Sequence, residues 1–389
     1  MKTFPFLLFA TFATACSCVE GAQFKDQTSD HKIQIGYGLA IADVNGDQKP
    51  DLLLADKQEI VWYENPGWQK HVIAEKLTEL DNVCLAAQDL DGDGKAEIAV
   101  GAGWNPGDTV NSGAVFYLVP PSNRTEKWKP VKLPHEPTVH RMWWVSDESG
   151  KYSLVVAPLH GRGNKNGAGE GVHLLEYQRP AAPDGAWTTK LIDDSMHMTH
   201  NLDPIQWDGD RAQEILFCGK EGILILDRGD NDWRKKRIAA ASGDGFAGAG
   251  EVRLGQMKND RFIAAIEPMH GTNVTVYTRP ASGELWDRHI LDSAISDGHA
   301  VATGDLLKKG ADQIVIGWRG KNARGKVGVK IFTAKDPKGA EWTESLVDDN
   351  GMACEDLKVA DLNGDGWLEI IAAGRATKNV KIYWNQGTD

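Results

Sequence analysis

The chain has 389 residues, of which 41% are hydrophobic and 25% charged, with 42 Gly, 16 Pro and 14 Trp. This is the composition of a soluble globular protein that can bury a large core. The 43 Lys and Arg against 55 Asp and Glu give a net charge of −12, and no basic block stands out, which argues against a nucleic-acid partner.

Residues 1–22 are predicted to be an export leader rather than part of the fold. Lys2 supplies a positive charge, residues 4–15 form an apolar run, and Ala13 and Ala15 fit the small-residue rule of a cleavage site. The run is too short to span a bilayer, so no transmembrane segment is expected. Cys16 follows directly and is a candidate for a lipid anchor, with plain secretion as the alternative. We expect an exported protein, periplasmic or extracellular, with lipid anchoring to the membrane left open.

After the leader, short runs of Val, Ile, Leu and aromatic residues alternate with Gly, Pro, Asn and Asp, which is typical of an all-β chain. An acidic segment recurs among them. Well-preserved copies occupy residues 43–51, 89–97 and 361–369, and degenerate copies lie near residues 146–153, 207–214, 255–262 and 304–312. Units of roughly 43–60 residues have the length of a four-stranded propeller blade. The repeats therefore predict an all-β, seven-bladed β-propeller of four-stranded blades as the single domain of residues 23–389.

A second recurring segment, Trp followed by alternating apolar residues, predicts the outer strand of the blades. The copy expected after Trp384 is missing, but Asp30–Ile35 near the N-terminus resembles it. We therefore predict that this segment pairs with residues 380–384 and closes the last blade. The ring would then have no exposed sheet edge.

The three well-preserved acidic loops are predicted calcium sites. Each offers oxygen ligands at alternate residues of a tight turn, a pattern that suits Ca²⁺, and the alternative is a solvated turn without metal. The predicted ligands are Asp43, Asn45, Asp47 and Asp51 in the first loop, Asp89, Asp91, Asp93 and Glu97 in the second, and Asp361, Asn363, Asp365 and Glu369 in the third.

Six of the 11 histidines fall at equivalent places in the repeat. His140, His200 and His299 open inner strands, with His197 just before, and His160 and His270 lie in Pro-x-His-Gly turns after second strands. These two kinds of position share one face of a propeller. The six histidines are therefore expected to converge at one mouth of the central channel.

Histidines combined with a carboxylate are the usual ligands of Zn²⁺ or a similar divalent ion, and a metal-free polar pocket is the alternative. Neutral imidazoles can also transfer protons near neutral pH. We predict the metal ligands His160, His200, Glu251 and His270. Proton transfer is assigned to His140 and His299, with Asp297 orienting His299. The predicted substrate-binding residues are Trp104, Asn105, His197, Lys220, Arg319, Glu355 and Arg375.

The acidic repeats resemble the FG-GAP/VCBS family of propeller repeats over nearly the whole chain after the leader. The turns at His160 and His270 and the stretch from His197 to Asn201 further resemble the propeller portion of the aldos-2-ulose dehydratase (1,5-anhydrofructose dehydratase) family. This resemblance implies a metal-assisted carbon–oxygen lyase, a dehydratase or β-eliminase. It would act on a small carbohydrate, a keto-sugar or 3-keto-glycoside, by removing the proton next to the carbonyl.

Two other functions remain open from the sequence. A polysaccharide lyase also eliminates across a carbon–oxygen bond but acts on a uronate, and several arginines lining an open cleft would favour it. A non-catalytic propeller that binds carbohydrate or protein would need only the calcium loops. A closed pocket with a bound metal would favour the keto-sugar.

Overall fold

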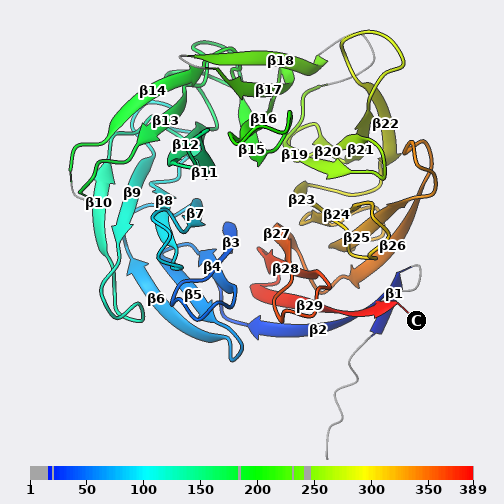
Figure 1. The fold of residues 1–389 in the computed structure, drawn as a ribbon, viewed down its shortest axis with the longest axis horizontal. Helices are drawn as coiled ribbons and strands as arrows, with labels where there is room; N and C mark the ends of the chain where they lie inside the picture. The colour runs from blue at the N-terminus through cyan, green and yellow to red at the C-terminus, as the bar shows by residue number, and fades with distance from the viewer. Residues whose placement is uncertain (1–15, 20–21, 183–184, 230–231, 241–246, 389) are drawn as a thin grey trace, which may run out of the picture.

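Seven antiparallel sheets stand around a central axis in the computed structural model, which describes residues 16–19, 22–182, 185–229, 232–240 and 247–388 (Figure 1). Six sheets have four strands and the seventh has five. These residues contain no helix, and hence none that could cross a membrane. The predicted all-β, seven-bladed propeller is confirmed.

The chain builds the blades in order, and each blade runs from the strand nearest the axis outwards. Blade 1 consists of β3 (Gly38–Ala42), β4 (Asp51–Ala55), β5 (Glu59–Glu64) and β6 (Gln69–Glu75). Blade 2 consists of β7 (Cys84–Gln88), β8 (Glu97–Ala102), β9 (Ala114–Val119) and β10 (Lys129–Leu133). Blade 3 consists of β11 (Val139–Ser146), β12 (Tyr152–Pro158), β13 (Leu174–Gln178) and β14 (Thr188–Asp193).

Blades 4 to 6 follow the same plan. Blade 4 consists of β15 (Thr199–Ile205), β16 (Glu214–Gly219), β17 (Gly222–Arg228) and β18 (Trp233–Ala240). Blade 5 consists of β19 (Glu251–Gln256), β20 (Arg261–Glu267), β21 (Asn273–Thr278) and β22 (Asp287–Asp292). Blade 6 consists of β23 (Gly298–Gly304), β24 (Gln313–Trp318), β25 (Gly328–Ala334) and β26 (Trp342–Asp349). Blade 7 contains β27 (Cys354–Ala360), β28 (Glu369–Gly374) and β29 (Asn379–Thr388), with β2 (Ala22–Asp30) and β1 (Cys16–Val19) outside them.

The second strand of each blade is apolar on both faces because it is packed between two neighbouring blades. β4, β8 and β28 are buried along their whole length, whereas most residues of the outer strands β10, β14 and β22 are exposed or half-buried. The packing between blades is close: a Cβ at Gly101 would lie 2.5 Å from Sγ of Cys84 and 2.9 Å from Cγ1 of Val139 in the next blade. Hydrophobic contact between adjacent blades therefore holds the ring together.

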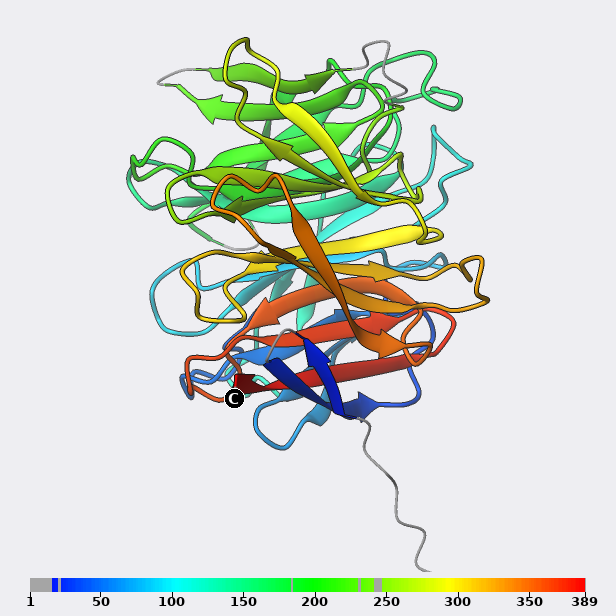
Figure 2. The ribbon, with the colours of Figure 1, turned by 90° about the vertical axis from the view of Figure 1, so that its right-hand side faces the viewer.

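An N-terminal strand does close the last blade, but the predicted segment is wrong. β2 pairs with β29, with Lys25 opposite Trp384 and Asp30 opposite Val380, and residues 31–35 lie outside any strand. Figure 2 shows the two strands side by side at the edge of the ring. β2 was overlooked because Phe24 is its one large apolar residue, 1% exposed, and the rest of the strand is polar.

The predicted leader falls mostly outside the described residues. Within it, residues 16–19 form β1, which pairs with the start of β2. Cleavage, export and a lipid anchor at Cys16 stay predictions. Beyond the leader, Cys84, Cys218 and Cys354 are all buried as free thiols.

The predicted calcium loops and the predicted histidine site lie on opposite faces of the ring, at the two ends of the inner strands. The acidic loops connect the first and second strands of their blades, at the far end of the inner strands. His140, His200 and His299 each occupy the second residue of β11, β15 and β23, at the near end. His160 and His270 follow β12 and β20 at that same near end. The repeat register inferred from the sequence is therefore correct.

Candidate functional site

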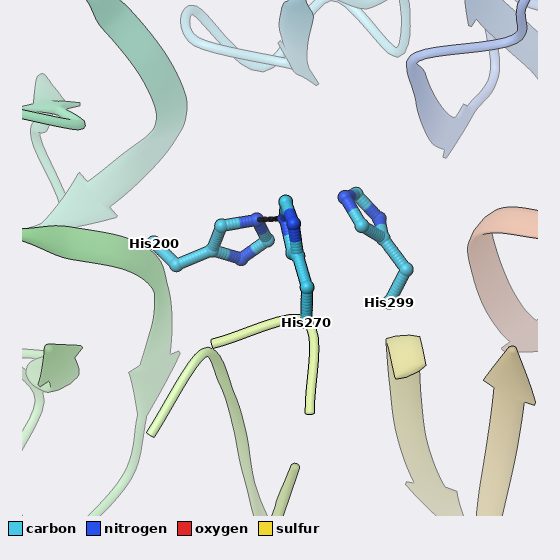
Figure 3. A group of neighbouring side chains, drawn as sticks. All are labelled: His200, His270 and His299. Atoms are coloured by element: carbon cyan, nitrogen blue, oxygen red, sulfur yellow. Dashed lines mark hydrogen bonds between the residues drawn. The ribbon is translucent and has the colours of Figure 1, made fainter. Parts of the chain in front are cut away.

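Three histidines from different elements meet at the near end of the channel. His200 comes from β15, His270 from the turn after β20 and His299 from β23, and in Figure 3 the ring of His270 lies between the other two. Each offers one ring nitrogen, and these nitrogens all lie within 4.8 Å of one another. Nε2 of His200 is 2.9 Å from Nε2 of His270, and the ring centroids of His270 and His299 are 4.8 Å apart.

A fourth ring extends the group. The centroid of His140, from β11, lies 4.5 Å from that of His200, and the ring centroid of Trp104 lies 4.9 Å from that of His140. His140 is 5% exposed and His200 1% exposed. We call His140, His200, His270 and His299 the histidine cluster.

The three inner-strand histidines each direct Nδ1 at a backbone carbonyl oxygen of the next sheet. The distances are 2.8 Å from His140 to His200, 2.9 Å from His200 to Gly250 and 2.6 Å from His299 to Glu355. A carbonyl oxygen only accepts hydrogen bonds, so Nδ1 carries the proton. Nε2 of each ring is then left with a free lone pair, the state that a metal ligand or a general base requires.

The environment keeps these rings neutral. Burial is the main cause, and nearby positive groups add to it: the pKa of His270 falls to about 2, and the pKa values of His140 and His299 fall well below 6.5. Burial also lowers the pKa of His200, against the opposing effect of Glu251. The tautomers of His200 and His299 suit a divalent ion such as Zn²⁺. Nδ1 of His270 instead lies 3.4 Å from Nη2 of Arg319, a donor, so this ring carries its proton on Nε2 when no ion is bound.

Glu251 lies on the Nδ1 side of the His200 ring, not on the side of the Nε2 atoms of the histidine cluster. Its Oε1 is 2.9 Å from Nδ1 of His200, and its Oε2 accepts a 2.6 Å hydrogen bond from Nδ2 of Asn201. Burial acts to raise its pKa, but its contact with His200 and the nearby charges of Arg253 and Arg141 lower it overall. Glu251 is therefore placed to orient the ring of His200.

The charged residues at the mouth form a closed network. Glu355, 1% exposed, accepts hydrogen bonds of 2.6 Å from Arg319 and 2.9 Å from Arg375. Arg319 also donates to Asp297 at 2.8 Å, and Asp297 lies 3.7 Å from Nδ1 of His270. Asp297 is thus near His270, whereas Nδ1 of His299 faces the carbonyl of Glu355.

Four predicted residues lie outside the ring contacts of the histidine cluster. His160 is 9% exposed, and its Nδ1 has no hydrogen-bond partner among the described residues. His197 pairs with Glu221 at 2.9 Å, and Nζ of Lys220 donates to the carbonyl of Gly167. The exposed Asn105 accepts a hydrogen bond from the backbone of Gly107.

The sequence analysis missed Tyr37, which immediately precedes β3 as Asp297 precedes β23. Its hydroxyl donates a 3.0 Å hydrogen bond to Asp81, and the guanidinium of Arg375 lies 5.3 Å from its ring centroid. Burial and Asp81 raise its pKa, so the phenol stays protonated. The repeat register would have identified it had tyrosines been aligned as well as histidines.

The predicted calcium loops differ in how closely their carboxylates approach. Asp89, Asp91 and Glu97 bring one oxygen each within 4.8 Å, and so do Asp208, Asp210 and Glu214 in a degenerate copy that the sequence analysis did not assign. In the first and third loops Asp43 and Asp361 accept hydrogen bonds from backbone N–H groups of their own loops, as Asp89 does in the second. The three predicted loops thus share these backbone hydrogen bonds, but among the described residues only the second of them brings three carboxylates close enough to hold one cation.

Comparisons with known proteins agree with this architecture. Residues 112–280 match the family model described as aldos-2-ulose dehydratase, beta-propeller domain, and residues 43–100 and 85–118 match models of FG-GAP-like and FG-GAP repeats. Aldos-2-ulose dehydratase of Phanerodontia chrysosporium is 22% identical over 409 aligned positions, which cover 95% of this chain and 41% of that protein. The chain thus spans about two fifths of its curated relative.

A chain from a solved structure titled "Crystal Structure of Mitotic Checkpoint Complex" is similar over 98% of both chains, with a TM-score of 0.56 and 13% identity. This likeness shows the fold alone. The family matches confirm the FG-GAP repeats and the resemblance to the aldos-2-ulose dehydratase propeller.

Proposed function

We propose that this relative of the aldos-2-ulose dehydratase propeller is a carbon–oxygen lyase that acts on a keto-sugar or a 3-keto-glycoside. The observation that carries the proposal is the histidine cluster: buried neutral rings whose Nδ1 atoms are held by backbone carbonyls. The match of residues 112–280 to the dehydratase propeller supports the reaction class.

His200, His270 and His299 would hold a divalent ion, since one nitrogen from each lies within 4.8 Å of the others. Such an ion would polarise the substrate carbonyl and stabilise the negative charge that develops on its oxygen. The sequence analysis assigned His299 to proton transfer; its position in this group makes it a ligand in the present proposal.

His140 is the general base of the proposed reaction. Its Nδ1 is tied to the carbonyl of His200, so the lone pair of Nε2 is available, and its lowered pKa keeps it unprotonated. The ring takes the proton from the carbon next to the carbonyl. The bond from the β-carbon to its oxygen substituent then breaks, and the imidazolium returns its proton to that oxygen, which leaves as water or an alcohol. The product is an enone.

Trp104 would pack against a sugar ring, because its ring centroid lies 4.9 Å from that of the proposed base His140. The mouth arginines argue against the uronate alternative. Arg319 and Arg375 both donate to Glu355, so their charges are already compensated and are less available for a substrate carboxylate.

The test is turnover of 1,5-anhydrofructose and a 3-keto-glucoside by ultraviolet detection of the enone, with elemental analysis of the same samples. We expect His200→Asn to lose both the ion and turnover, and His140→Asn to keep the ion while turnover falls by about 10²–10⁴-fold. His71→Asn on the outer strand β6 is the matched control and should change neither. Undiminished turnover in His140→Asn, or cleavage of a polyuronate instead, would overturn the proposal.

A further inference from the structure

A second cavity lies on the channel axis, separate from the histidine cluster. Its volume is about 200 Å³. One side is formed by the inner strands β3 and β7, whose small residues include Gly38, Ala40 and Ala86. The lining also includes long charged side chains from blades 3, 5 and 7: Arg141, Arg253 and Lys358, together with Asp356. Three cationic groups and one carboxylate thus line a single cavity.

Both guanidinium groups are buried, and neither donates a hydrogen bond to a carboxylate among the described residues, although Arg253 lies at ion-pair distance from two. Arg141 is 8% exposed and Arg253 7% exposed. Among the described residues, Arg141 donates one hydrogen bond, to the carbonyl of His140, and Arg253 donates one, to the carbonyl of Val252. No carboxylate lies within 4.0 Å of Arg141 in the described part of the chain. The carboxylates nearest Arg253 are those of Asp203 at 3.8 Å and Glu251 at 4.0 Å, beyond hydrogen-bond distance.

The other charged groups around the cavity are already satisfied. Nζ of Lys358 is 2.9 Å and 3.0 Å from the two oxygens of Asp356, and Oδ2 of Asp356 also accepts the backbone N–H of Leu39 at 2.8 Å. Most of the donors of Arg141 and Arg253 have no acceptor in the described part of the chain, although buried charged groups are normally hydrogen-bonded. None of these nitrogens is fully buried without a partner, so the free donors face the cavity. The planar fork of a guanidinium matches a carboxylate or a phosphate.

We propose that this axial cavity is a binding site for a small oxyanion, a carboxylate or phosphate group, held by Arg141 and Arg253. The volume would accommodate roughly six or seven waters, and hence a ligand of a few heavy atoms. The lining also includes Ile41, Gln88 and Val359, half-buried residues close to the acidic loops. The oxyanion would enter from the acidic-loop face, opposite the histidine cluster, so this site does not depend on the proposed lyase activity.

The test is isothermal titration of the full chain with sodium phosphate and with sodium acetate, each against sodium chloride at equal ionic strength. All titrations use the His200→Asn background, which is expected to lack the ion, so that an anion cannot act through an ion in the histidine cluster. We expect saturable binding of at least one oxyanion, weakened at least about tenfold in Arg141→Gln and partly restored in Arg141→Lys. Arg253→Gln is expected to weaken binding as Arg141→Gln does. Binding of phosphate alone would identify the ligand as a phosphate group, and binding of both anions would show that the site also accepts a carboxylate.

Arg162→Gln is the matched control, because the side chain of Arg162 is 50% exposed and its partner Glu136 lies outside the cavity. This variant should bind like the parent. Phosphate stabilises many proteins without a site, so a rise in melting temperature counts only where it differs between the parent and the arginine variants. Heat changes equal to those of chloride, or binding that survives in both Arg141→Gln and Arg253→Gln, would show that the cavity holds water only.

Discussion

Nε2 of His200 and Nε2 of His270 face each other at 2.9 Å. Nδ1 of His200 donates to the carbonyl of Gly250, so its Nε2 brings a lone pair to this contact. The contact is then favourable if His270 donates a proton from Nε2, or if both lone pairs bind one cation. Burial lowers the pKa of His270 to about 2, which disfavours a doubly protonated ring near neutral pH. Nη2 of Arg319 lies 3.4 Å from Nδ1 of His270, so without an ion His270 donates from Nε2, and a divalent ion would take the place of that proton.

The support of His200 by Glu251 gives the first prediction. Glu251→Gln should weaken divalent-ion binding by about 10–100-fold, because a carboxylate behind a ligating imidazole orients the ring and raises its basicity. The measurement is competition for Zn²⁺ or Co²⁺ against a chelator. Glu221→Gln is the matched control, since Glu221 makes the same 2.9 Å contact with His197 outside the cluster. Equal losses in both variants would contradict the assignment.

The neutral histidines predict how stability depends on pH. The pKa of His270 in the folded state lies far below its ordinary value of 6.5, so below pH 6.5 the unfolded chain binds more protons. The stability due to this ring is therefore complete above pH 6.5 and is lost progressively as the pH falls towards about 2. Urea unfolding of metal-free protein between pH 8 and 5 should show a smaller loss in His270→Gln than in the parent. Identical pH dependence in the two proteins would mean that His270 is charged in the folded state.

The acidic loops predict a pH effect of the opposite sign. Glu369 is fully buried, one of its oxygens has no hydrogen-bond partner among the described residues, and burial raises its pKa to about 7. Without metal, its contribution to stability is complete below its usual pKa and is lost as the pH rises through about 7. Metal-free Glu369→Gln should therefore unfold at a higher temperature than the parent at pH 8, with little difference near pH 4.

Added Ca²⁺ should reverse that order, because an ion that binds only the folded state stabilises the parent by about 2.7 kcal/mol at 100 times its dissociation constant. Asn363→Ala should reduce the response to Ca²⁺ without changing turnover. The measurement is the melting temperature with and without chelator. A parent protein whose melting temperature ignores both calcium and chelator would show the loops to be ordinary turns.

The sequence was sufficient for the ring, the order of its strands and the face that carries the histidines, because one repeat register places every blade. The repeat register does not determine the orientation of a side chain at the channel. Glu251 and His299 both start inner strands, yet Glu251 turns behind His200 while His299 joins it in the group of close ring nitrogens. His160 and His270 occupy equivalent turns, and only His270 contacts the other rings. Pairings between blades, such as Arg319 with Glu355, are equally invisible in a single chain.

The closing strand gives the last prediction. Phe24 is the large apolar residue through which β2 joins the core shared by blades 6 and 7, and it is 1% exposed. Phe24→Ala should therefore destabilise the protein by about 3–5 kcal/mol, as for other buried aromatic residues. Chemical unfolding provides the measurement, and Leu80→Ala is the control, because Leu80 is 44% exposed and its truncation should lower the free energy of unfolding far less.

Deletion of residues 23–30 should have a larger effect, because it leaves β29 without its outer partner strand and an exposed strand edge promotes association. A deletion variant that stays monomeric in light scattering and melts like the parent would mean that β2 does not close the ring.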